Sequence, residues 1–243
     1  MISVVMPAHN EEAFLANAVA EVVGEMRSRP GDFEIVVVEN GSTDRTVEVA
    51  GKLAVDFHEV RALSRPVADY GGALRAGFLE AAGDLVAIFD VDYYDFGFLD
   101  RALALMNAGG GPDVVVGSKR GSGAVDTRGW PRRLVTAVFT TVLRYGFGLK
   151  VADTHGVKVL RRAPLRDLAA QCRYGTDIYD TELILRAERA GLSVTSVPVT
   201  VEERRPSRSS IARRIPRTLL ALARLRFALW NEERRARGAD APL

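Results

Sequence analysis

The sequence predicts an α/β fold in which helices cover both faces of a mostly parallel sheet. Two observations support this. Uninterrupted apolar runs of strand length recur along the first 120 residues, and segments with apolar residues at helical spacing separate them. Strands that read as continuous apolar runs are typical of parallel sheets buried on both faces. With 243 residues, 47% of them hydrophobic, the chain can bury a sizeable core.

The first predicted strand is the β-branched run Ile2 to Met6, which Pro7 ends. From Phe14 to Met26 the apolar residues fall on one face of a helix. Glu34 to Val38 is the second strand, and a weaker strand follows at Phe57 to Leu63. A turn at Gly71 then opens a helix that runs to Ala82.

The next strand is Leu85 to Phe89, followed by a helix around Phe98 to Met106 and a strand at Asp113 to Val116. Pro131 suits the first turn of a helix that continues to Phe147. These elements complete the alternation of strands and helices that a parallel sheet requires.

The segments just after four of the predicted strands are unusually polar. In parallel sheets the carboxyl ends of the strands share one edge, where ligands bind. Any one of these segments reads equally well as a solvated loop, but four at one edge indicate a site. They are Pro7-Ala8-His9-Asn10-Glu11, Glu39-Asn40-Gly41-Ser42, Asp90-Val91-Asp92 and Gly117-Ser118-Lys119-Arg120.

Asp90 and Asp92 directly follow a buried strand. Two carboxylates so close together repel each other unless a cation lies between them. Hard oxygen ligands of this kind suit Mg²⁺ or Mn²⁺, which proteins commonly share with substrate phosphates. We therefore expect a metal site that neutralises a diphosphate at this point.

The charge of the chain is distributed unevenly. Its net charge is only +2, but the first 203 residues carry 22 basic and 28 acidic residues, and the remainder carries 11 basic and 3 acidic. The basic tail predicts an amphipathic helix with Leu219, Leu222, Leu225 and Leu229 on one side and arginines opposite. Such a helix either lies on an anionic membrane or packs on the domain.

Several classes of protein are disfavoured. No run of about 18 apolar residues would span a bilayer, and the N-terminus has no charged lead-in or cleavage signal. The single Cys172 excludes an internal disulfide. No aromatic residues alternate with the tail arginines as they do in nucleic-acid-binding patches. We expect a cytoplasmic protein that binds no nucleic acid and is peripheral, if membrane-bound, on the inner face of the cell membrane.

Seven segments resemble, in order and spacing, the family 2 GT-A glycosyltransferases, and the nearest branch is the one that transfers sugars to dolichyl or polyprenyl phosphate. The resemblance covers about Ile2 to Ile211 and lies in the ordered set of segments. They include MPAHNEE, EIVVVENGSTD, YGGALRAGFLEAAGDLVAIFDVD, VVVGSKR, DTHGVKVLRR, YDTELILRAERAGLSVTSVPV and RRPSRSS.

The resemblance implies a Rossmann-like GT-A domain at residues 1–210, with a donor half (1–120) and an acceptor half (121–210), before a basic helix and tail at 211–243. It also implies a GDP- or UDP-linked sugar donor, Mg²⁺ or Mn²⁺, and inversion at the anomeric carbon. Polyprenyl phosphate is the expected acceptor. The alternative is a soluble enzyme that glycosylates a hydroxyl group of a metabolite, natural product or glycan.

The resemblance carries over to individual residues of this chain. Asp90 and Asp92 fall on the metal motif, and Asp180 and Glu182 fall in an acidic box at the reaction centre, with Asp180 as the base for a hydroxyl acceptor. The implied catalytic residues are Asp92, Asp180, Arg133 and Arg204. The implied donor-binding residues are Pro7, Ala8, His9, Glu11, Val38, Glu39, Asn40, Asp90, Val91, Asp92, Lys119 and Arg120.

The chain departs from the family pattern at several positions. Glu39 and Asn40 replace a usual pair of aspartates, which leaves guanine and uracil open as the base of the donor. Tyr94 stands where mannosyl-transferring members often carry Gln, and His155 replaces a usual Gln. The segment Ser207 to Ser210 lacks the Gly and Lys of the family loop, which leaves the acceptor open.

Overall fold

The computed structural model describes residues 1–118, 125–126, 130–151, 154–173, 175, 178–201 and 211–239, and at some of these positions, such as 130–133 and 211–215, the backbone alone. The chain divides into two compact units, Met1–Arg205 and Pro206–Leu243. Each unit is described by itself.

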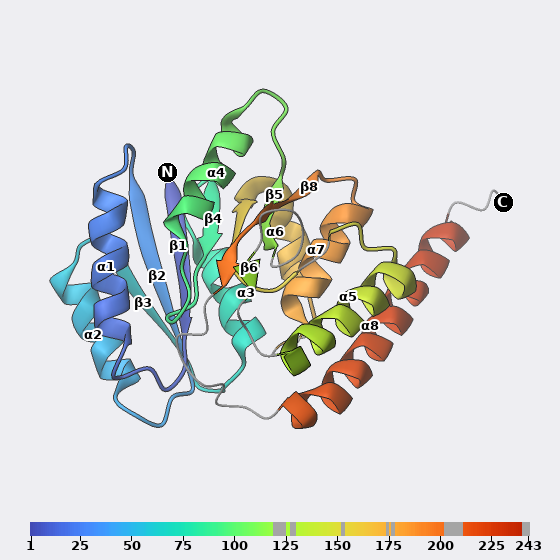
Figure 1. Cartoon of the computed structure of the whole chain (residues 1–243), viewed down its shortest axis with the longest axis horizontal. Coiled ribbons are helices and arrows are strands. Elements are labelled where there is room, and N and C mark those ends of the chain that lie inside the picture. The colour runs from blue at the N-terminus through green and yellow to red at the C-terminus, as the bar shows by residue number, and fades with distance from the viewer. Residues whose placement is uncertain are drawn as a thin grey trace. The chain divides into compact units, whose positions relative to one another are not determined.

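A seven-stranded sheet, in the order β3-β2-β1-β4-β7-β5-β8, forms the centre of the first unit (Figure 1). Two further short strands, β6 (Val125–Asp126) and β9 (Thr200–Val201), pair with each other. The strands of the large sheet are β1 (Ile2–Ala8), β2 (Phe33–Asn40), β3 (Val60–Arg65), β4 (Leu85–Ile88), β5 (Val114–Ser118), β7 (Lys158–Arg161) and β8 (Val194–Pro198).

The sheet is mostly parallel, as the sequence predicts. β1 pairs in parallel with β2 and β4, β2 with β3, and β5 with β8. The exception is β7, which lies between β4 and β5 and is antiparallel to both. Because two reversals restore the direction, β5 and β8 run the same way as the first four strands.

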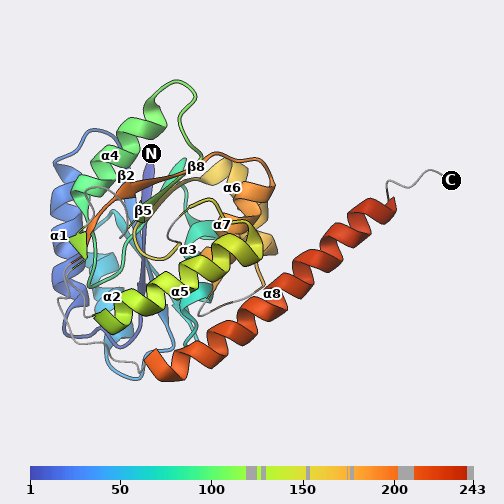
Figure 2. The same cartoon turned by 45° about the vertical axis from the view of Figure 1, so that its right-hand side comes forward.

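Helices cover both faces of this sheet, which also confirms the prediction (Figures 1 and 2). One face carries α1 (Leu15–Arg27), α2 (Thr46–Asp56) and α4 (Phe96–Asn107), whose buried apolar residues belong to one core cluster with Val4 and Met6 of β1. The opposite face carries α3 (Tyr70–Glu80), α6 (Arg162–Gln171) and α7 (Tyr179–Arg189), which contact one another. The first unit also contains α5 (Trp130–Phe147).

The apolar face predicted for α1 is buried along the helix from Leu15 to Met26. Phe14 is the exception: it precedes the first turn and is exposed. On the opposite side of the sheet, α3 approaches the strands closely at Gly77, where a Cβ atom would lie 2.3 Å from Cγ1 of Val5. Only a glycine therefore permits this spacing between helix and sheet.

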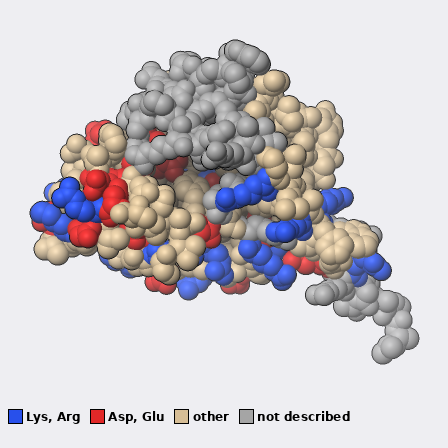
Figure 3. All heavy atoms as spheres, turned by 90° about the horizontal axis from the view of Figure 1, so that it is seen from below, with Lys and Arg blue, Asp and Glu red and all other residues tan. Residues whose placement is uncertain are grey.

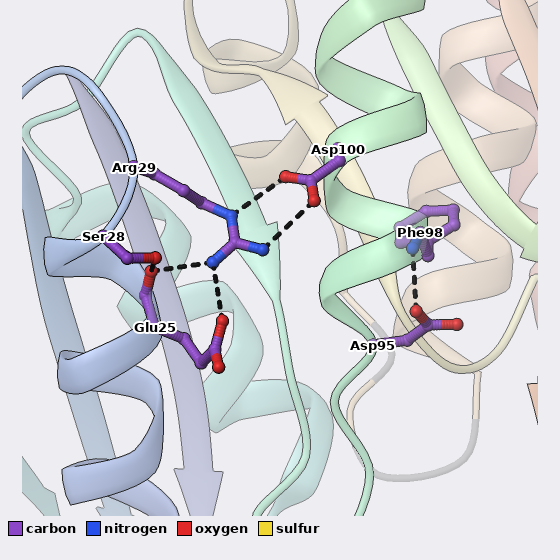
Figure 4. Close-up of polar contacts among 6 residues, drawn as sticks. All are labelled: Glu25, Ser28, Arg29, Asp95, Phe98 and Asp100. Atoms are coloured by element: carbon purple, nitrogen blue, oxygen red, sulfur yellow. Dashed lines mark hydrogen bonds and ion pairs between the residues drawn. The ribbon is translucent and has the colours of Figure 1, made fainter.

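Arg29, which follows the last residue of α1 by two positions, joins α1 to α4. Its Nε donates to Oδ1 of Asp100 at 2.9 Å and its Nη2 donates to Oδ2 at 3.1 Å, while its Nη1 donates to Glu25 (Figure 4). Asp95 caps α4 by accepting a hydrogen bond from the backbone N–H of Phe98. This cap fixes the start of the helix that follows the Asp90–Asp92 segment.

The described part of the second unit is α8 (Ile211–Ala239), which confirms the predicted C-terminal helix. The rings of Phe227 and Trp230 lie 6.0 Å apart, and the guanidinium of Arg234 lies 4.7 Å from the centre of the Trp230 ring. Across the described parts of the chain, no helix combines the length and the apolar character that a membrane span needs.

Candidate active site

The four strands after which polar segments were predicted, β1, β2, β4 and β5, have their carboxyl ends at one edge of the sheet. β1, β2, β4 and β5 run in the same direction, and Ala8 and Glu39 are register partners, so β1 and β2 end level with each other. In Figure 1 this edge is at the bottom, and Figure 3, seen from below, shows Asp and Glu atoms near the middle of this face. The site is therefore built at the carboxyl ends of the strands, as expected for an open α/β sheet.

Hydrogen bonds join the loop after β1 to the loop after β2. The N–H of Thr43 donates to Oδ1 of Asn10 at 2.8 Å, and the N–H of Asn10 donates to Oγ of Ser42 at 3.0 Å. The N–H of Glu11 donates to Oγ1 of Thr46 at 2.7 Å. Asn10 has a φ of 55°, a left-handed conformation that asparagine tolerates better than most residues. These bonds fix the backbone that carries His9 and Glu11.

Asn40 holds three segments together at the end of β2. Its Nδ2 donates to the carbonyl oxygen of Ala8 at 2.9 Å, and its Oδ1 accepts the N–H of Asp69 at 3.1 Å. Its own carbonyl oxygen accepts a hydrogen bond from Nδ1 of His9 at 2.8 Å, which places the proton of that ring on Nδ1 and leaves Nε2 to face Nδ2 of Asn10. The exposed His9 ring is thereby held in one orientation.

Glu39 is buried, and both of its carboxylate oxygens accept hydrogen bonds from the protein. Oε1 accepts the N–H of Ser42 at 2.6 Å, and Oε2 accepts the hydroxyl of Ser64 at 2.8 Å. The side chains of Ala8 and Val38 are also buried, within the strands. Glu39 thus shapes the loop after β2, and the nucleobase contact expected from it stays a prediction.

Asp90 follows β4 in a tight turn, in which its N–H and carbonyl oxygen pair with those of Tyr93. The hydroxyl of Tyr70 donates to Oδ1 of Asp90 at 2.8 Å. Burial raises the pKa of Asp90, and the neighbouring Asp92 and Asp180 add to this, whereas Tyr70 and Lys158 oppose it. Asp92 is exposed. Tyr70 therefore binds one oxygen of the Asp90 carboxylate, Oδ1, and not the other.

Tyr70 is a residue at this site that the sequence analysis did not single out. Burial and the charges of Asp90 and Asp180 raise its pKa well above the ordinary value, so its hydroxyl stays protonated and acts as a donor. It begins α3 beside Gly71, where a Cβ atom would lie 2.6 Å from the carbonyl carbon of Gly175. The tight packing at Gly71 brings the start of α3 against the segment that precedes α7.

Asp180 lies in the first turn of α7 and forms an ion pair with Lys158 of β7. The distance from Nζ of Lys158 to Oδ1 of Asp180 is 2.9 Å, and the two side chains are 1% and 4% exposed. Asp180 was predicted from the sequence, and Lys158 was not. The sequence signal that could have identified Lys158 is its position within an apolar run, because a buried ammonium group needs a partner.

Glu182, which the resemblance places beside Asp180, has other partners. Its Oε1 accepts a hydrogen bond from Nε of Arg186 at 2.9 Å, and its Oε2 accepts the N–H of Arg173 at 3.0 Å. Residues two apart on a helix point in nearly opposite directions, so Asp180 and Glu182 do not project to the same side. The ion pair with Lys158 is made by Asp180.

The oxygen donors at this edge fit a hard divalent cation. Asp90 and Asp92 supply carboxylates from alternate positions of one turn, which is the donor chemistry of Mg²⁺ and Mn²⁺. Among the residues that the structure describes, no group of three or more His, Cys, Asp or Glu side chains is arranged to hold a metal. Two carboxylates are consistent with a cation whose remaining ligands are water and the phosphate oxygens of a substrate.

The family of the chain follows from comparison with known proteins. Residues 3–169, more than half of the chain, match the family model described as glycosyl transferase family 2. The chain belongs to glycosyl transferase family 2. It is thus a glycosyltransferase, and its α/β sheet with helices on both faces is the GT-A architecture of solved structures that it resembles.

Three proteins to which the chain is similar are informative. An uncharacterized glycosyltransferase of Mycobacterium tuberculosis is 31% identical over 91% of this chain and 94% of its own length. A dolichyl-phosphate beta-glucosyltransferase of Trichomonas vaginalis is 27% identical over 83% of this chain and 66% of its own. The crystal structure of glucosyl-3-phosphoglycerate synthase from M. tuberculosis with Mn²⁺, UDP-glucose and phosphoglyceric acid is 26% identical, with a TM-score of 0.63, over 85% of this chain and 72% of its own.

Four basic residues were expected at this site from the sequence. Lys119, Arg120 and Arg204 lie outside the described residues, and so does the side chain of Arg133, whose backbone belongs to α5. His155, which replaces a usual Gln, is described: its Nδ1 lies 3.1 Å from Oγ1 of Thr154, and its ring lies 5.5 Å from that of Phe139 of α5.

Proposed function

We propose that the chain transfers a sugar from a nucleoside-diphosphate sugar to a polyprenyl phosphate, with inversion at the anomeric carbon. The observation that carries the proposal is the group of Asp90, Asp92 and Asp180 at the strand ends, with Tyr70 and Lys158 paired to two of them. The family supports sugar transfer, and the relative that acts on dolichyl phosphate supports a lipid phosphate acceptor.

The donor half binds the nucleoside diphosphate. Pro7, Ala8, His9, Glu11, Val38, Glu39 and Asn40 surround the base and ribose in this proposal, and Val91 separates the two carboxylates that hold Mg²⁺ or Mn²⁺. When bound, the cation supplies Lewis-acid stabilisation of the negative charge that grows on the departing phosphate oxygen. Lys119 and Arg120 add cationic hydrogen-bond donors to the same oxygens.

A phosphate acceptor needs positioning more than deprotonation. A phosphate monoester is already an anion near neutral pH, so the carboxylates have no proton to remove from it. Forked hydrogen bonds from arginines would hold it in line with the anomeric carbon, and Arg133 and Arg204 are the residues proposed for this task. In this reaction Asp180 orients a sugar hydroxyl and does not act as a base.

A second function is favoured by one observation. The M. tuberculosis synthase was crystallised with phosphoglyceric acid, a small water-soluble molecule. In the second function, the chain glycosylates a hydroxyl group of such a metabolite, natural product or glycan. A neutral hydroxyl must lose its proton in the transition state, and Asp180 is the carboxylate proposed to accept it.

Radiolabelled sugar transfer separates these two functions. The purified chain is incubated with UDP-glucose or GDP-mannose, Mn²⁺, and either a short polyprenyl phosphate or 3-phosphoglycerate. We expect label that extracts into organic solvent in the polyprenyl phosphate reactions, and EDTA should abolish it. Label that stays in the aqueous phase with every donor would refute the lipid acceptor, and a glycosylated phosphoglycerate would establish the second function.

Two variants test the residues. Asp92→Asn should reduce transfer with either acceptor by about 100-fold or more, because it removes a ligand of the cation. Asp32→Asn, at an exposed aspartate before β2, is the matched control and should keep full activity. Asp180→Asn should abolish transfer only if the acceptor is a hydroxyl.

The proposed place of reaction is the inner face of the cell membrane, where a polyprenyl phosphate presents its head group to the cytoplasm. The basic helix α8 is proposed to hold the enzyme there as a peripheral protein. The arginines of α8 suit an anionic lipid surface.

A further inference from the structure

Lys158 occupies an unusual position for a lysine. It begins β7, and its register partners are Ile88 of β4 and Val116 of β5. β4 leads directly into the Asp90–Asp92 turn. The antiparallel strand therefore introduces a cation between β4 and β5, two of the strands whose ends form the site, and the side chain is 1% exposed.

The contact between Lys158 and Asp180 is an attraction of charges more than a directed bond. The atoms Nζ and Oδ1 are 2.9 Å apart, yet among the described residues Nζ has no hydrogen-bond partner of acceptable geometry. At this distance the two groups attract each other, because an ammonium group is a compact charge whose attraction depends little on angle. In a buried pair this attraction is weakly screened by water.

Asp180 needs such a partner because it shares its surroundings with other acids. The charges of Asp90, Asp92 and Asp180 all act on the hydroxyl of Tyr70, and the charge of Lys158 acts on Asp90 as well as on Asp180. Three carboxylates so near one another would repel each other and turn apart. A fixed cation on one side opposes this and leaves the other side of the site to the substrate.

We propose that Lys158 is a positioning residue that fixes the carboxylate of Asp180 for sugar transfer. This inference rests on the proposed function only in assigning Asp180 to the reaction centre. Lys158 binds Oδ1 and leaves Oδ2 of Asp180 to meet a hydroxyl group of the donor sugar or of the acceptor. Lys158 itself touches neither substrate.

A double-mutant cycle on turnover tests the proposal. The variants are Lys158→Met, Asp180→Asn and both together, assayed for sugar transfer and for release of free sugar from the donor by water. Lys158→Met alone should lower kcat by about 100-fold, as expected for a misplaced catalytic group, with little change in KM for the donor. In the Asp180→Asn background the same substitution should change kcat by less than about twofold, because residues that act through each other are not additive.

The control is Lys52→Met, which removes a lysine from an exposed ion pair with Asp56, 2.6 Å long, on α2. It should leave kcat unchanged. If Lys158→Met lowers kcat by the same factor with and without Asp180, or does not lower it at all, the proposal is wrong. If Lys158→Met does not fold, comparing Asp180→Asn with the double variant can still refute the proposal, because the double variant contains no unpaired charge of the pair. A change in kcat of more than about twofold between these two would mean that Lys158 acts by a route other than Asp180.

Thermal unfolding of the same variants, together with the turnover assays, distinguishes failure of the Lys158 proposal from failure of the proposed function. Each single substitution should lower Tm by roughly 10 °C, and the double variant by much less than the sum, since removing one partner leaves a buried charge unpaired. Turnover of the donor by water without transfer to lipid would refute the polyprenyl phosphate acceptor and leave the Lys158 cycle measurable. No turnover of any kind by the unaltered chain would overturn both proposals.

Discussion

Asp90 and Asp180 are held by side chains of different chemical kinds. Asp90 accepts a hydrogen bond from the neutral phenol of Tyr70, and Asp180 is paired with the cation of Lys158. The difference has a physical reason. A carboxylate that is to bind a divalent cation gains from a partner that orients it without adding positive charge, whereas a carboxylate that binds no metal tolerates a lysine.

Tyr70→Phe tests this account of Asp90. The substitution removes the hydroxyl donor and keeps the ring, so Asp90 loses the bond that fixes its carboxylate. A hydrogen bond to a charged group contributes about 1.5 kcal/mol or more, so the Mn²⁺ concentration for half-maximal activity should rise about tenfold. Titration of activity with Mn²⁺ measures it. Tyr145→Phe, at a tyrosine of α5 that is 82% exposed, is the control, and an unchanged Mn²⁺ requirement in Tyr70→Phe would contradict the account.

At the scale of elements, the distance between α3 and the sheet depends on Gly77. A Cβ atom there would lie 2.3 Å from Cγ1 of Val5, whereas a Cβ atom at Gly24 of α1 would meet nothing within 4 Å. Gly77→Ala should therefore destabilise the protein by about 1–3 kcal/mol through overpacking. Gly24→Ala should stabilise it by up to about 1 kcal/mol, because alanine is the better helix former.

Urea unfolding of the two glycine variants measures both effects with the same chemical change. We expect the free energy of unfolding to fall in Gly77→Ala and to rise in Gly24→Ala. Equal destabilisation by the two substitutions would show that the loss of glycine itself matters, and would refute the packing argument. The substitution at Gly77 should also displace the start of α3, and with it Tyr70, so its activity should fall as well.

The end of α1 is joined to the segment before β3 by Arg27 and Glu59, whose atoms Nε and Oε1 are 2.7 Å apart. The hydrogen bond from Arg27 lowers the pKa of Glu59 against the opposing effect of burial. A carboxyl with a lowered pKa stabilises the fold above its ordinary pKa of about 4.3, and this contribution is lost as the pH falls through the folded-state value. Glu59→Gln should thus lower Tm at pH 7, and the difference from the unaltered protein should vanish in acid.

Thermal unfolding between pH 7 and pH 3 checks this prediction. The exposed Asp32→Asn variant is the control and should run parallel to the unaltered protein throughout. A Tm difference for Glu59→Gln that persists unchanged at pH 3 would mean that the substitution acts by a route other than the charge of Glu59.

The sequence predicted those elements whose signal is local. Continuous apolar runs identified β1, β2, β4 and β5, and because parallel strands share an edge, they also predicted where the site lies. β7 was missed because charged residues, Lys158 and Arg161, stand at both of its ends, so it shows no continuous apolar run of strand length. Contacts between distant segments, such as Tyr70 with Asp90, leave no periodic pattern in the sequence, so these partners became visible only in the structure.

At the scale of the whole molecule, the two charge regions of the chain belong to different units. The acids that surround the site lie in Met1–Arg205, and most arginines of the basic tail lie in Pro206–Leu243. A compact acidic unit and a basic helix would be expected to prefer different partners. The first suits a cation and a sugar, and the second suits an anionic surface.

Binding of the full chain to lipid vesicles tests the role of the basic helix. Arg217 and Arg224 are two turns apart on one side of α8, and Phe227 and Trp230 are exposed apolar residues of the same helix. We expect sedimentation with vesicles that contain anionic lipid, weaker binding as salt increases, and no binding to neutral vesicles. Each arginine near the surface contributes about 1 kcal/mol, so Arg217→Gln with Arg224→Gln should weaken binding about 30-fold. The control is Arg45→Gln with Lys52→Gln, which removes two cations from α2 and the loop before it and should change binding little. An equal loss of binding in both double variants would mean that the vesicles attract the net charge of the protein and not α8.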